Sequence, residues 1–225
     1  MTMTRFTRLP VAFAAFGLAA LSMGADPPAA PKTLVLFDGK TLDGWKKSDF
    51  TGAGDVKVED GTILLAVGNR MTGITSTRKD LPTTNYELNY EANRLKGNDF
   101  FAAATFPVVK SFITFVNGGW SGNITGLSSL NGADASENET SQFFKYQNNT
   151  WYRFRVRVTD DVIRCSIDDK EIVVLSHKDR QLSTRIETRE NQPLGFATYE
   201  STGALRKIEI RMLSAAEIAA VNKTE

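Results

Sequence analysis

The sequence predicts an all-β protein in which antiparallel strands pack as a sandwich or a barrel. Roughly ten to twelve short apolar runs follow one another along the chain, and turn residues separate them. Between these runs there is no long segment with the helical period that a crossover between parallel strands requires. The pattern therefore favours antiparallel sheets.

Turn pairs mark the first expected strands. The apolar run 34–37 ends at Asp38-Gly39, and the runs 56–59 and 62–67 are joined by Asp60-Gly61. A two-residue Asp-Gly connection is typical of a β-hairpin, because both residues accept the positive φ angles of that turn. We therefore expect a hairpin at this point of the chain.

Alternation marks the strands in the middle of the chain. Residues 86–93 place four apolar side chains on one face and four polar ones on the other, and residues 152–158 alternate in the same way. The other expected strands are 100–106, 111–116, 162–167, 171–175, 194–199 and 207–212. After them, Ser214 and Glu217 have the spacing of a capping box, which predicts a short helix at 215–221.

The amino terminus has the composition of a secretory signal peptide. Arg5 and Arg8 precede an apolar run at 9–21, and small residues follow at Ser22 and Gly24. The run is shorter than the ~20 apolar residues that cross a bilayer. We therefore expect a secreted or periplasmic protein. Its expected parts are a signal peptide at 1–24, an extended proline-rich linker at 25–32, a β-sandwich domain at 33–213 and a tail at 214–225.

Composition argues against several classes of protein. The 225 residues carry a formal charge of +1, so a nucleic-acid-binding protein, which needs a basic surface, is not expected. One cysteine cannot form a disulfide scaffold, and one histidine argues against zinc held by several imidazoles. After residue 24 no apolar run is long enough to span a membrane. The composition leaves the oligomeric state open.

Several segments resemble the 3-keto-disaccharide hydrolase domain family. The most specific likeness lies in the opening segment 35–45, VLFDGKTLDGW, and the resemblance extends over residues 33–213. The other segments that fit the family layout are 58–63, 85–88, 151–156, 167–170 and 207–211. The resemblance implies a concanavalin A-like jelly-roll of two antiparallel sheets, in secreted bacterial proteins that act on or bind carbohydrate.

The middle of the chain departs from the family pattern. Residues 99–146 lack the Gly-Asn-Ser-Gly segment that common members have after the alternating strand, and residues 97–101 and 117–120 stand in its place. Chemistry that the family performs through this region is therefore not transferred to this chain.

The polar face of residues 86–93 is a candidate catalytic surface. Glu87 and Glu91 lie about 13 Å apart along one strand, too far for the carboxylate pair of a glycosidase. The resemblance implies a 3-keto sugar, whose acidified C2 proton needs only one base. We expect Glu91 as that base, and Asn89 and Arg155 as substrate-binding residues. The alternative is a solvated outer face.

Two loops supply further candidates. The glycine-rich loop 118–123 holds Trp120, whose ring can stack on a pyranose, and Asn117 precedes it. We expect both residues to bind substrate; the alternative is a tight turn with a core tryptophan.

The second loop, 131–140, is acidic and rich in hydroxyl groups. We expect Glu137 as a catalytic stabiliser and Asp134 and Glu139 as metal ligands. Calcium is the expected ion, because it accepts carboxylate and amide oxygens in flexible geometry. The loop lacks the glycine of an EF-hand, and a solvated loop is the alternative.

Three arginines, Arg153, Arg155 and Arg157, form a stripe along one expected strand. They either bind carboxylated or sulfated glycans through forked hydrogen bonds or pair with acids on neighbouring strands. Cys165 alternates with apolar residues and is expected to be a buried thiol, whereas His177 is expected in a loop.

Two functions follow from these patterns. The first is a secreted enzyme that cleaves glycosidic bonds; the family resemblance implies a 3-keto-glycoside as substrate, cleaved by elimination, after which water adds. The second is a non-catalytic module that binds carbohydrate through Trp120 and the polar strand face, or that serves in cell-surface assembly. Convergence of Glu91 with the loop 134–139 in one cleft would favour the enzyme.

Overall fold

The computed structural model describes residues 1–2 and 33–223. The chain divides into two units, Met1–Ala30 and Pro31–Glu225, and the fold described below is that of the second. The expected linker at 25–32 and all but two residues of the expected signal peptide lie outside the described residues. No helix formed by the described residues has the length and apolar character needed to cross a bilayer.

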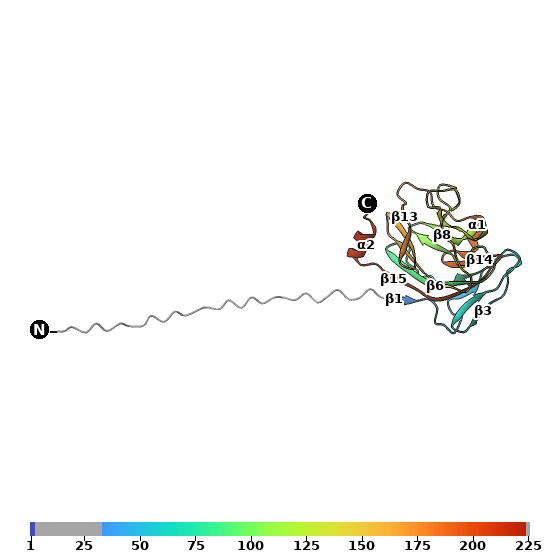
Figure 1. Cartoon of the computed structure of the whole chain (residues 1–225), viewed down its shortest axis with the longest axis horizontal. Coiled ribbons are helices and arrows are strands. Elements are labelled where there is room, and N and C mark those ends of the chain that lie inside the picture. Colours follow the sequence, from blue (N-terminus) through green and yellow to red (C-terminus); the bar gives the residue numbers. More distant parts are fainter. Residues whose placement is uncertain (3–32, 224–225) are drawn as a thin grey trace. The chain divides into compact units, whose positions relative to one another are not determined.

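The second unit is a sandwich of two antiparallel sheets, as the sequence predicts (Figure 1). Sheet A contains β1 (Thr33–Val35), β3 (Val56–Glu59), β4 (Thr62–Leu65), β6 (Tyr86–Lys96), β11 (Trp151–Val158), β12 (Val162–Ile167), β13 (Lys170–Ser176) and β15 (Thr202–Met212). Its order is β13-β12-β11-β6-β15-β4-β3, and β1 pairs with β15.

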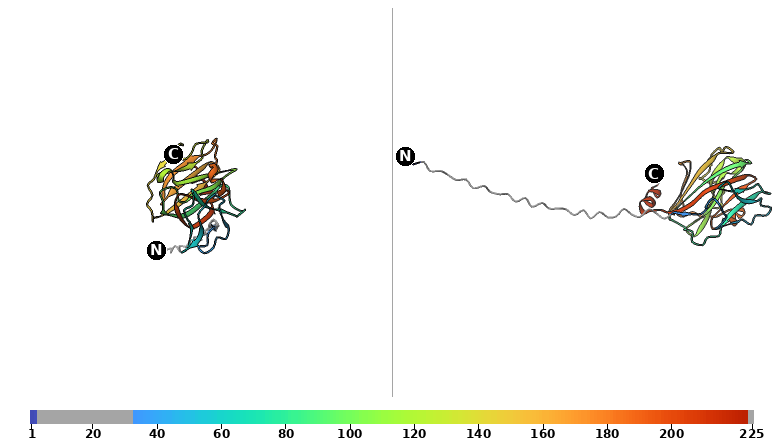
Figure 2. Two further views of the ribbon diagram at one scale, coloured as in Figure 1. Left: turned by 90° about the vertical axis from the view of Figure 1, so that its right-hand side faces the viewer. Right: turned by 90° about the horizontal axis from the view of Figure 1, so that it is seen from below.

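Sheet B forms the second layer, and Figure 2 shows the body from two further sides. It contains β2 (Trp45–Lys47), β5 (Met71–Ser76), β7 (Ala103–Val108), β8 (Ser111–Gly118), β9 (Ile124–Ser128), β10 (Gln142–Phe143) and β14 (Gly195–Tyr199). Its order is β10-β9-β8-β7-β14-β5-β2.

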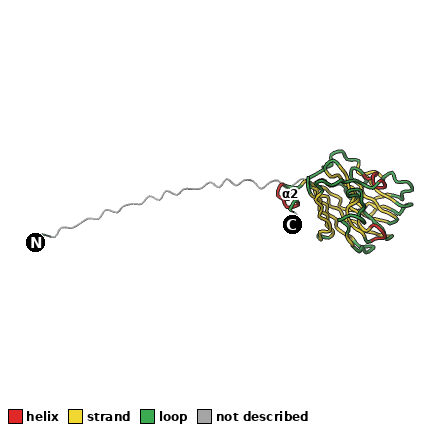
Figure 3. Tube along the Cα trace, turned by 90° about the horizontal axis from the view of Figure 1, so that it is seen from above, coloured by secondary structure: helices red, strands yellow, loops and turns green. Residues whose placement is uncertain are grey.

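Three short helical segments complete the described part of the chain. They are α1 (Gly119–Gly122), the 3-10 helix η1 (Ile186–Asn191) and α2 (Ala215–Val221). The predicted capping box of α2 is confirmed, because the Ser214 hydroxyl accepts the Glu217 N–H and the Glu217 carboxylate accepts the Ser214 N–H. Val221 and Leu213 pack against Val162, which anchors α2 at the margin of the strand body (Figure 3).

The core lies between the two sheets and is rich in aromatic rings. Tyr90 of sheet A stacks on Phe154 at 4.8 Å between ring centroids and meets the edge of Phe196 of sheet B at 4.8 Å. All three side chains are buried. The predicted alternation of residues 86–93 is confirmed, because Tyr90 and its apolar neighbours face this core. Cys165 is also buried, and burial raises the pKa of its thiol.

One expectation about the strands is confirmed, and another is corrected. The hairpin at Asp60 and Gly61 is confirmed, with positive φ angles of 48° and 73°. The strand expected at 100–106 instead begins at Ala103 and ends at Val108. The Phe100 N–H donates to the side chain of Asp99, so this part of the backbone is held in a bend outside the ladder.

The outer face of sheet B is covered as well as its inner face. Every residue of β5 and β7 is buried, although their side chains alternate between the two faces. The segment η1 contributes to this cover, because the Asn191 amide donates to the Ile74 and Phe196 carbonyls at 3.0 and 3.3 Å. The cover is incomplete, and the gap that remains forms the site described next.

Candidate functional site

A cavity of about 480 Å³ opens over the outer face of sheet B. Its floor includes Thr114 and Val116 of β8, which alternate with the core residues Ile113 and Phe115. Its walls come from segments distant in sequence. Residues lining these walls include Phe50, Asn69, Arg70, Asp99, Phe100, Trp120, Arg185, Glu187, Thr188 and Tyr199.

Trp120 is presented to the cavity by a strained loop. Trp120 and Ser121 have left-handed φ angles of 49° and 64°, and Gly122 follows at 95°. A Cβ atom at Gly122 would lie 2.3 Å from the Asn98 carbonyl oxygen, so only glycine fits. The Trp120 side chain stays partly accessible, with 39% of the residue exposed. The structure therefore places this predicted substrate-binding residue at a cavity rather than in the core.

Asp99 ties this loop to the neighbouring wall. One oxygen of its carboxylate accepts the Ser121 N–H at 3.0 Å, and the other accepts the Phe100 N–H at 2.8 Å. Phe100 and Tyr199 lie 5.7 Å apart between ring centroids and form a second aromatic part of the wall. Because both carboxylate oxygens are engaged with the backbone, Asp99 builds the wall that carries Trp120.

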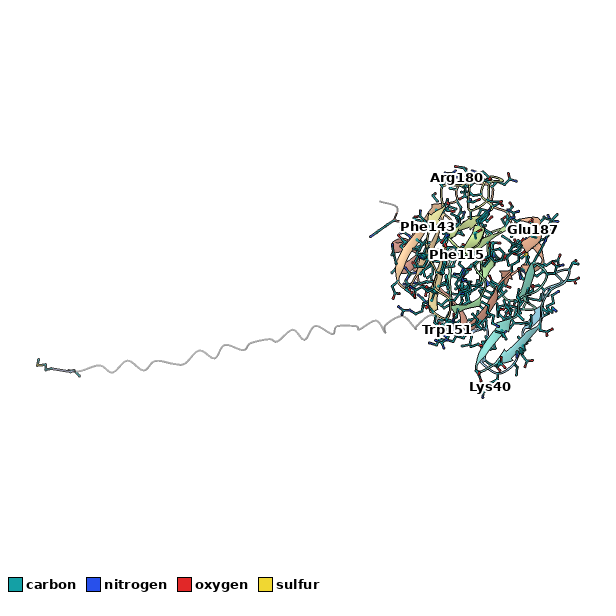
Figure 4. All side chains as sticks on the ribbon, turned by 45° about the vertical axis from the view of Figure 1, so that its right-hand side comes forward. Lys40, Phe115, Phe143, Trp151, Arg180 and Glu187 are labelled. Carbon is teal, nitrogen blue, oxygen red and sulfur yellow. The ribbon has the colours of Figure 1, made fainter. Side chains whose placement is uncertain are left out.

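A charged pair stands at another wall of the cavity. Arg185 donates to both oxygens of Glu187, at 3.2 and 3.1 Å, and it also pairs with Asp134. The hydrogen bond from Arg185 lowers the pKa of Glu187, and the same bond raises the pKa of Arg185. Glu187 is therefore ionised at neutral pH, and half of its side chain is exposed. Figure 4 labels Glu187 among the side chains of the strand body.

Packing of η1 on sheet B fixes the position of this pair. The hydroxyl of Thr188 lies 3.3 Å from that of Thr114 on β8, and the Thr75 hydroxyl donates to the Glu190 carbonyl at 2.5 Å. Arg185 immediately precedes η1, and Glu187 is its second residue. The sequence shows no periodic pattern here, which is why this carboxylate was not predicted.

Arg70 is the second cation of the cavity wall. It has a φ angle of +84°, and its carbonyl accepts the Glu200 N–H at 2.7 Å. Among the residues that the structure describes, no carboxylate lies within 4.0 Å of its guanidinium nitrogens. The sequence did not point to Arg70, because it lies in a short connection between two strands.

The structure places Asn89, Glu91 and Arg155 elsewhere, around a hollow of about 220 Å³ on the outer face of sheet A. Glu91 forms ion pairs with Arg206 at 2.7 Å and with Lys207 at 2.8 Å. Burial would raise the pKa of Glu91, but the hydrogen bonds from Lys207 and Arg206 outweigh it, and the pKa is lowered. Glu91 and the loop 134–139 therefore do not converge in one cleft.

The arginine stripe pairs with acids, which was one of its two predicted roles. Arg153 and Arg155 each donate to Asp169, at 2.7 and 2.8 Å. Arg157 donates to Glu87 of the neighbouring strand at 2.6 Å. This face of sheet A is a network of mutually neutralising charges.

Asn117 is completely buried and holds backbone rather than a ligand. Its side-chain amide donates to the Ala102 carbonyl at 2.9 Å, and its side-chain oxygen accepts the Ala102 N–H at 3.2 Å. Both bonds tie the end of β8 to the segment before β7. The side chain that was expected to bind substrate is therefore part of the frame beneath the cavity.

The loop 131–140 is organised by its own hydrogen bonds. The Asn138 amide donates to the Leu127 and Asp134 carbonyls, each at 2.8 Å. Asp134 pairs with Arg185, whereas Glu139 pairs with Arg180 at 3.0 Å. Within the described part of the chain, no group of three or more His, Cys, Asp or Glu residues is placed to hold a metal ion.

Glu137, the third acid of this loop, is exposed. Its charge contributes to the raised pKa of Arg185, with smaller weight than Glu187 and Asp134. The predicted acidic loop thus reaches the cavity indirectly, because it holds the arginine that orients Glu187. The expected metal-binding role of Asp134 and Glu139, and the calcium expected there, stay predictions.

Solved structures share this architecture at low sequence identity. The carbohydrate-binding module CBM66 from Bacillus subtilis is 13% identical, with a TM-score of 0.50 over 74% of this chain and 94% of that one. The apo Crh5 transglycosylase is 13% identical, with a TM-score of 0.53 over 83% and 85%.

A third structure is domain 4 of AbnA, an extracellular arabinanase from Geobacillus stearothermophilus, in complex with arabinotriose. It is 14% identical, with a TM-score of 0.50 over 80% of this chain and 88% of that one. The predicted fold class is confirmed: the chain is a concanavalin A-like sandwich of the kind found in proteins that bind or process carbohydrate.

Family comparison makes the assignment more specific. Residues 32–211 match the model of the 3-keto-alpha-glucoside-1,2-lyase-like domain. The chain belongs to this family, and the resemblance inferred from the segment 35–45 is confirmed. Comparison with curated proteins gives no significant match. The chain is thus a carbohydrate-active β-sandwich domain related to 3-keto-glucoside lyases.

Proposed function

We propose that this chain is a secreted enzyme that binds a saccharide in the sheet B cavity and cleaves 3-keto-glucosides there by elimination. The observation that carries the proposal is the meeting of Trp120, Phe100 and the Arg185–Glu187 pair around one cavity. Membership of the 3-keto-alpha-glucoside-1,2-lyase-like family supports the type of reaction. The amino-terminal pattern of residues 1–24 supports export.

The aromatic side chains would supply most of the binding energy. The C–H groups on one face of a pyranose are apolar and pack well on an indole or phenyl ring. Trp120 and Phe100 lie on loops that Asp99 fixes to each other, so few torsions have to be ordered on binding. The cavity volume of about 480 Å³ is within the range of small-ligand sites.

Glu187 would act as the base. The 3-keto group acidifies the C2 proton, and the ionised carboxylate accepts that proton. The electron pair of the C2–H bond then forms the C1–C2 double bond as the C1–O bond breaks. The same carboxyl group returns the proton to the departing oxygen, which leaves as an alcohol, and water subsequently adds to the unsaturated ketone.

Arg185 would have two effects on this reaction. Its hydrogen bonds keep Glu187 ionised, and its guanidinium lines the same cavity, where it would donate to a sugar oxygen that gains negative charge. The hydrogen bond from Arg185 that lowers the pKa of Glu187 holds its carboxylate ionised and in place, and the neighbouring ketone assists removal of the C2 proton by taking up the negative charge as an enolate.

The test compares a 3-keto-glucoside with the unmodified glucoside, and the release of the aglycone is measured. We expect the wild-type chain to release aglycone only from the keto sugar, and Glu187→Gln to lose at least about a hundredfold in kcat. Glu139→Gln is the matched control, because the Arg180–Glu139 pair has the same exposed fractions, 40% and 50%, as Arg185–Glu187. Full activity of Glu187→Gln would refute this assignment.

A second candidate function is non-catalytic carbohydrate binding. Both carboxylates of the cavity are already engaged, because Asp99 accepts two backbone N–H groups and Glu187 accepts from Arg185. A cavity without a free carboxylate to take up a proton favours binding without catalysis. Binding of keto and unmodified sugars without turnover of either would support this second function and refute the enzyme.

A further inference from the structure

We propose that the sheet B cavity selects saccharides that carry an anionic group, a carboxylate or a sulfate ester, and that Arg70 binds this group. The inference rests on the proposed function of the cavity, and it specifies the substrate class. It concerns a residue that has no part in the elimination described above.

The distribution of charges in the cavity carries the inference. Four charged side chains line it: Arg70, Asp99, Arg185 and Glu187. Arg185 is neutralised by Glu187 and Asp134, and Asp99 accepts two backbone N–H groups. Arg70 alone presents a charge that no group of the described chain engages.

The other arginines make this observation specific. Within residues 33–223, every arginine except Arg70, Arg94 and Arg189 forms an ion pair. Arg94 is buried and donates to the carbonyls of Tyr146 and Asp99 and to the side chain of Asn148. Arg189 is exposed and does not line the cavity. Most arginines of the described chain are thus paired, and of the two exposed arginines without an ion pair, Arg70 and Arg189, Arg70 lines the cavity.

The backbone holds Arg70 in place at a conformational cost. A φ of +84° is unfavourable for a residue with a side chain, so the surrounding structure has to hold Arg70 in this conformation. Two neighbouring segments fix the connection, because the Asn69 N–H donates to the Gly52 carbonyl at 2.8 Å and the Arg70 carbonyl accepts the Glu200 N–H at 2.7 Å. The backbone that carries the Arg70 guanidinium is therefore fixed in position.

The chemistry of the guanidinium defines the ligand group. Its planar N–H donors match two oxygens of a carboxylate or of a sulfate, and the ion pair is strengthened where aromatic walls reduce contact with water. A neutral sugar hydroxyl would use only one or two of these donors and would leave the charge uncompensated. A saccharide with a uronate unit or a sulfate ester meets both requirements of the cavity, aromatic stacking and charge.

The experiment measures affinity by isothermal titration calorimetry for three glucose-based disaccharides: neutral, with one glucuronate unit, and with one sulfate ester. We expect the wild-type chain to bind at least one anionic sugar about tenfold more tightly than the neutral one, with a preference that falls as salt is added. The two anionic arms distinguish carboxylate from sulfate.

Variants of Arg70 test the residue itself. Arg70→Gln should bind the two anionic sugars no more tightly than the neutral sugar. Arg70→Lys keeps the positive charge but loses the paired N–H donors of the guanidinium, so it should retain part of the preference for anionic sugars. Arg189→Gln removes an exposed, unpaired arginine from η1 and should leave the preference unchanged. Thermal unfolding of each variant shows that it is folded.

Three results would overturn the inference. Equal affinity of the wild-type chain for neutral and anionic sugars refutes it and leaves the proposed function standing. An anionic preference that survives in Arg70→Gln also refutes it. Failure of all three sugars to bind also refutes the inference, and the proposed function is then judged separately by the release of aglycone from the 3-keto-glucoside.

Discussion

Replacing Glu91 by glutamine tests which outer face of the sandwich, that of sheet A or that of sheet B, carries the active site. Glu91 lies on the outer face of sheet A, and the sequence made it the expected base. In the structure it is the common partner of Arg206 and Lys207. We expect Glu91→Gln to destabilise the fold and to leave saccharide binding and turnover unchanged.

The size of the effect follows from the exposure of the three side chains. Glu91 is 13% exposed, Arg206 36% and Lys207 67%. A hydrogen bond to a charged group contributes about 1.5–3 kcal/mol, whereas an exposed ion pair contributes about 0–1 kcal/mol. Glutamine keeps one oxygen that can accept from Arg206. The expected loss is therefore about 2 kcal/mol, or roughly 4–8 °C in Tm for a domain of this size.

The measurement is thermal and urea unfolding of both proteins, followed by circular dichroism at neutral and acidic pH. Because the pKa of Glu91 is lowered, its contribution to stability is complete above the ordinary value of 4.5 and is lost as the pH falls through the lower folded value. The difference between wild type and variant should shrink accordingly. Glu59→Gln, at the exposed Lys57–Glu59 pair, should cost less than about 0.5 kcal/mol.

One result would refute this reasoning. If Glu91→Gln unfolds like the wild type and abolishes turnover of a 3-keto-glucoside, Glu91 is catalytic, and the hollow on sheet A is the active site.

Three further predictions concern the sheet B cavity. Trp120→Ala should weaken saccharide binding about tenfold in calorimetric titration, because the stacking surface is lost; unchanged affinity would exclude the ring from the binding site. Asn117→Ala should lower the free energy of unfolding in urea by about 1–3 kcal/mol, since two buried groups of Ala102 lose their partner; unchanged stability would contradict the framework role. Arg185→Gln should move the acid limb of the pH–kcat/KM profile upward, towards the ordinary glutamate value of 4.5, because it removes the main cause of the lowered pKa of Glu187; an unshifted limb would contradict Glu187 as the base.

Local patterns predicted the strands and their faces. The alternation of residues 86–93 placed Tyr90 in the core and Glu91 outside it, and the Asp60-Gly61 pair gave the hairpin. The glycines around Trp120 identified a loop that presents an aromatic ring. Each of these inferences rests on residues within a few positions of one another.

Local sequence patterns could not predict the cavity, because segments that are far apart in the sequence meet there. Asp99 and Ser121 are 22 residues apart, and Asp134 and Arg185 are 51 apart, yet each pair is in contact. Glu187, the proposed base, lies in a 3-10 helix, and the sequence around it has no periodic pattern. The regular alternation of residues 86–93 predicted a polar face that could carry a site. The same alternation is also typical of an outer surface on which charges pair with one another.

A crystal structure of the chain with a bound 3-keto-glucoside tests the central claim most directly. The account predicts that the sugar occupies the sheet B cavity, with its ring against Trp120 and its C2 atom facing the Glu187 carboxylate. A sugar bound instead in the hollow formed by Asn89, Glu91 and Arg155 would contradict it.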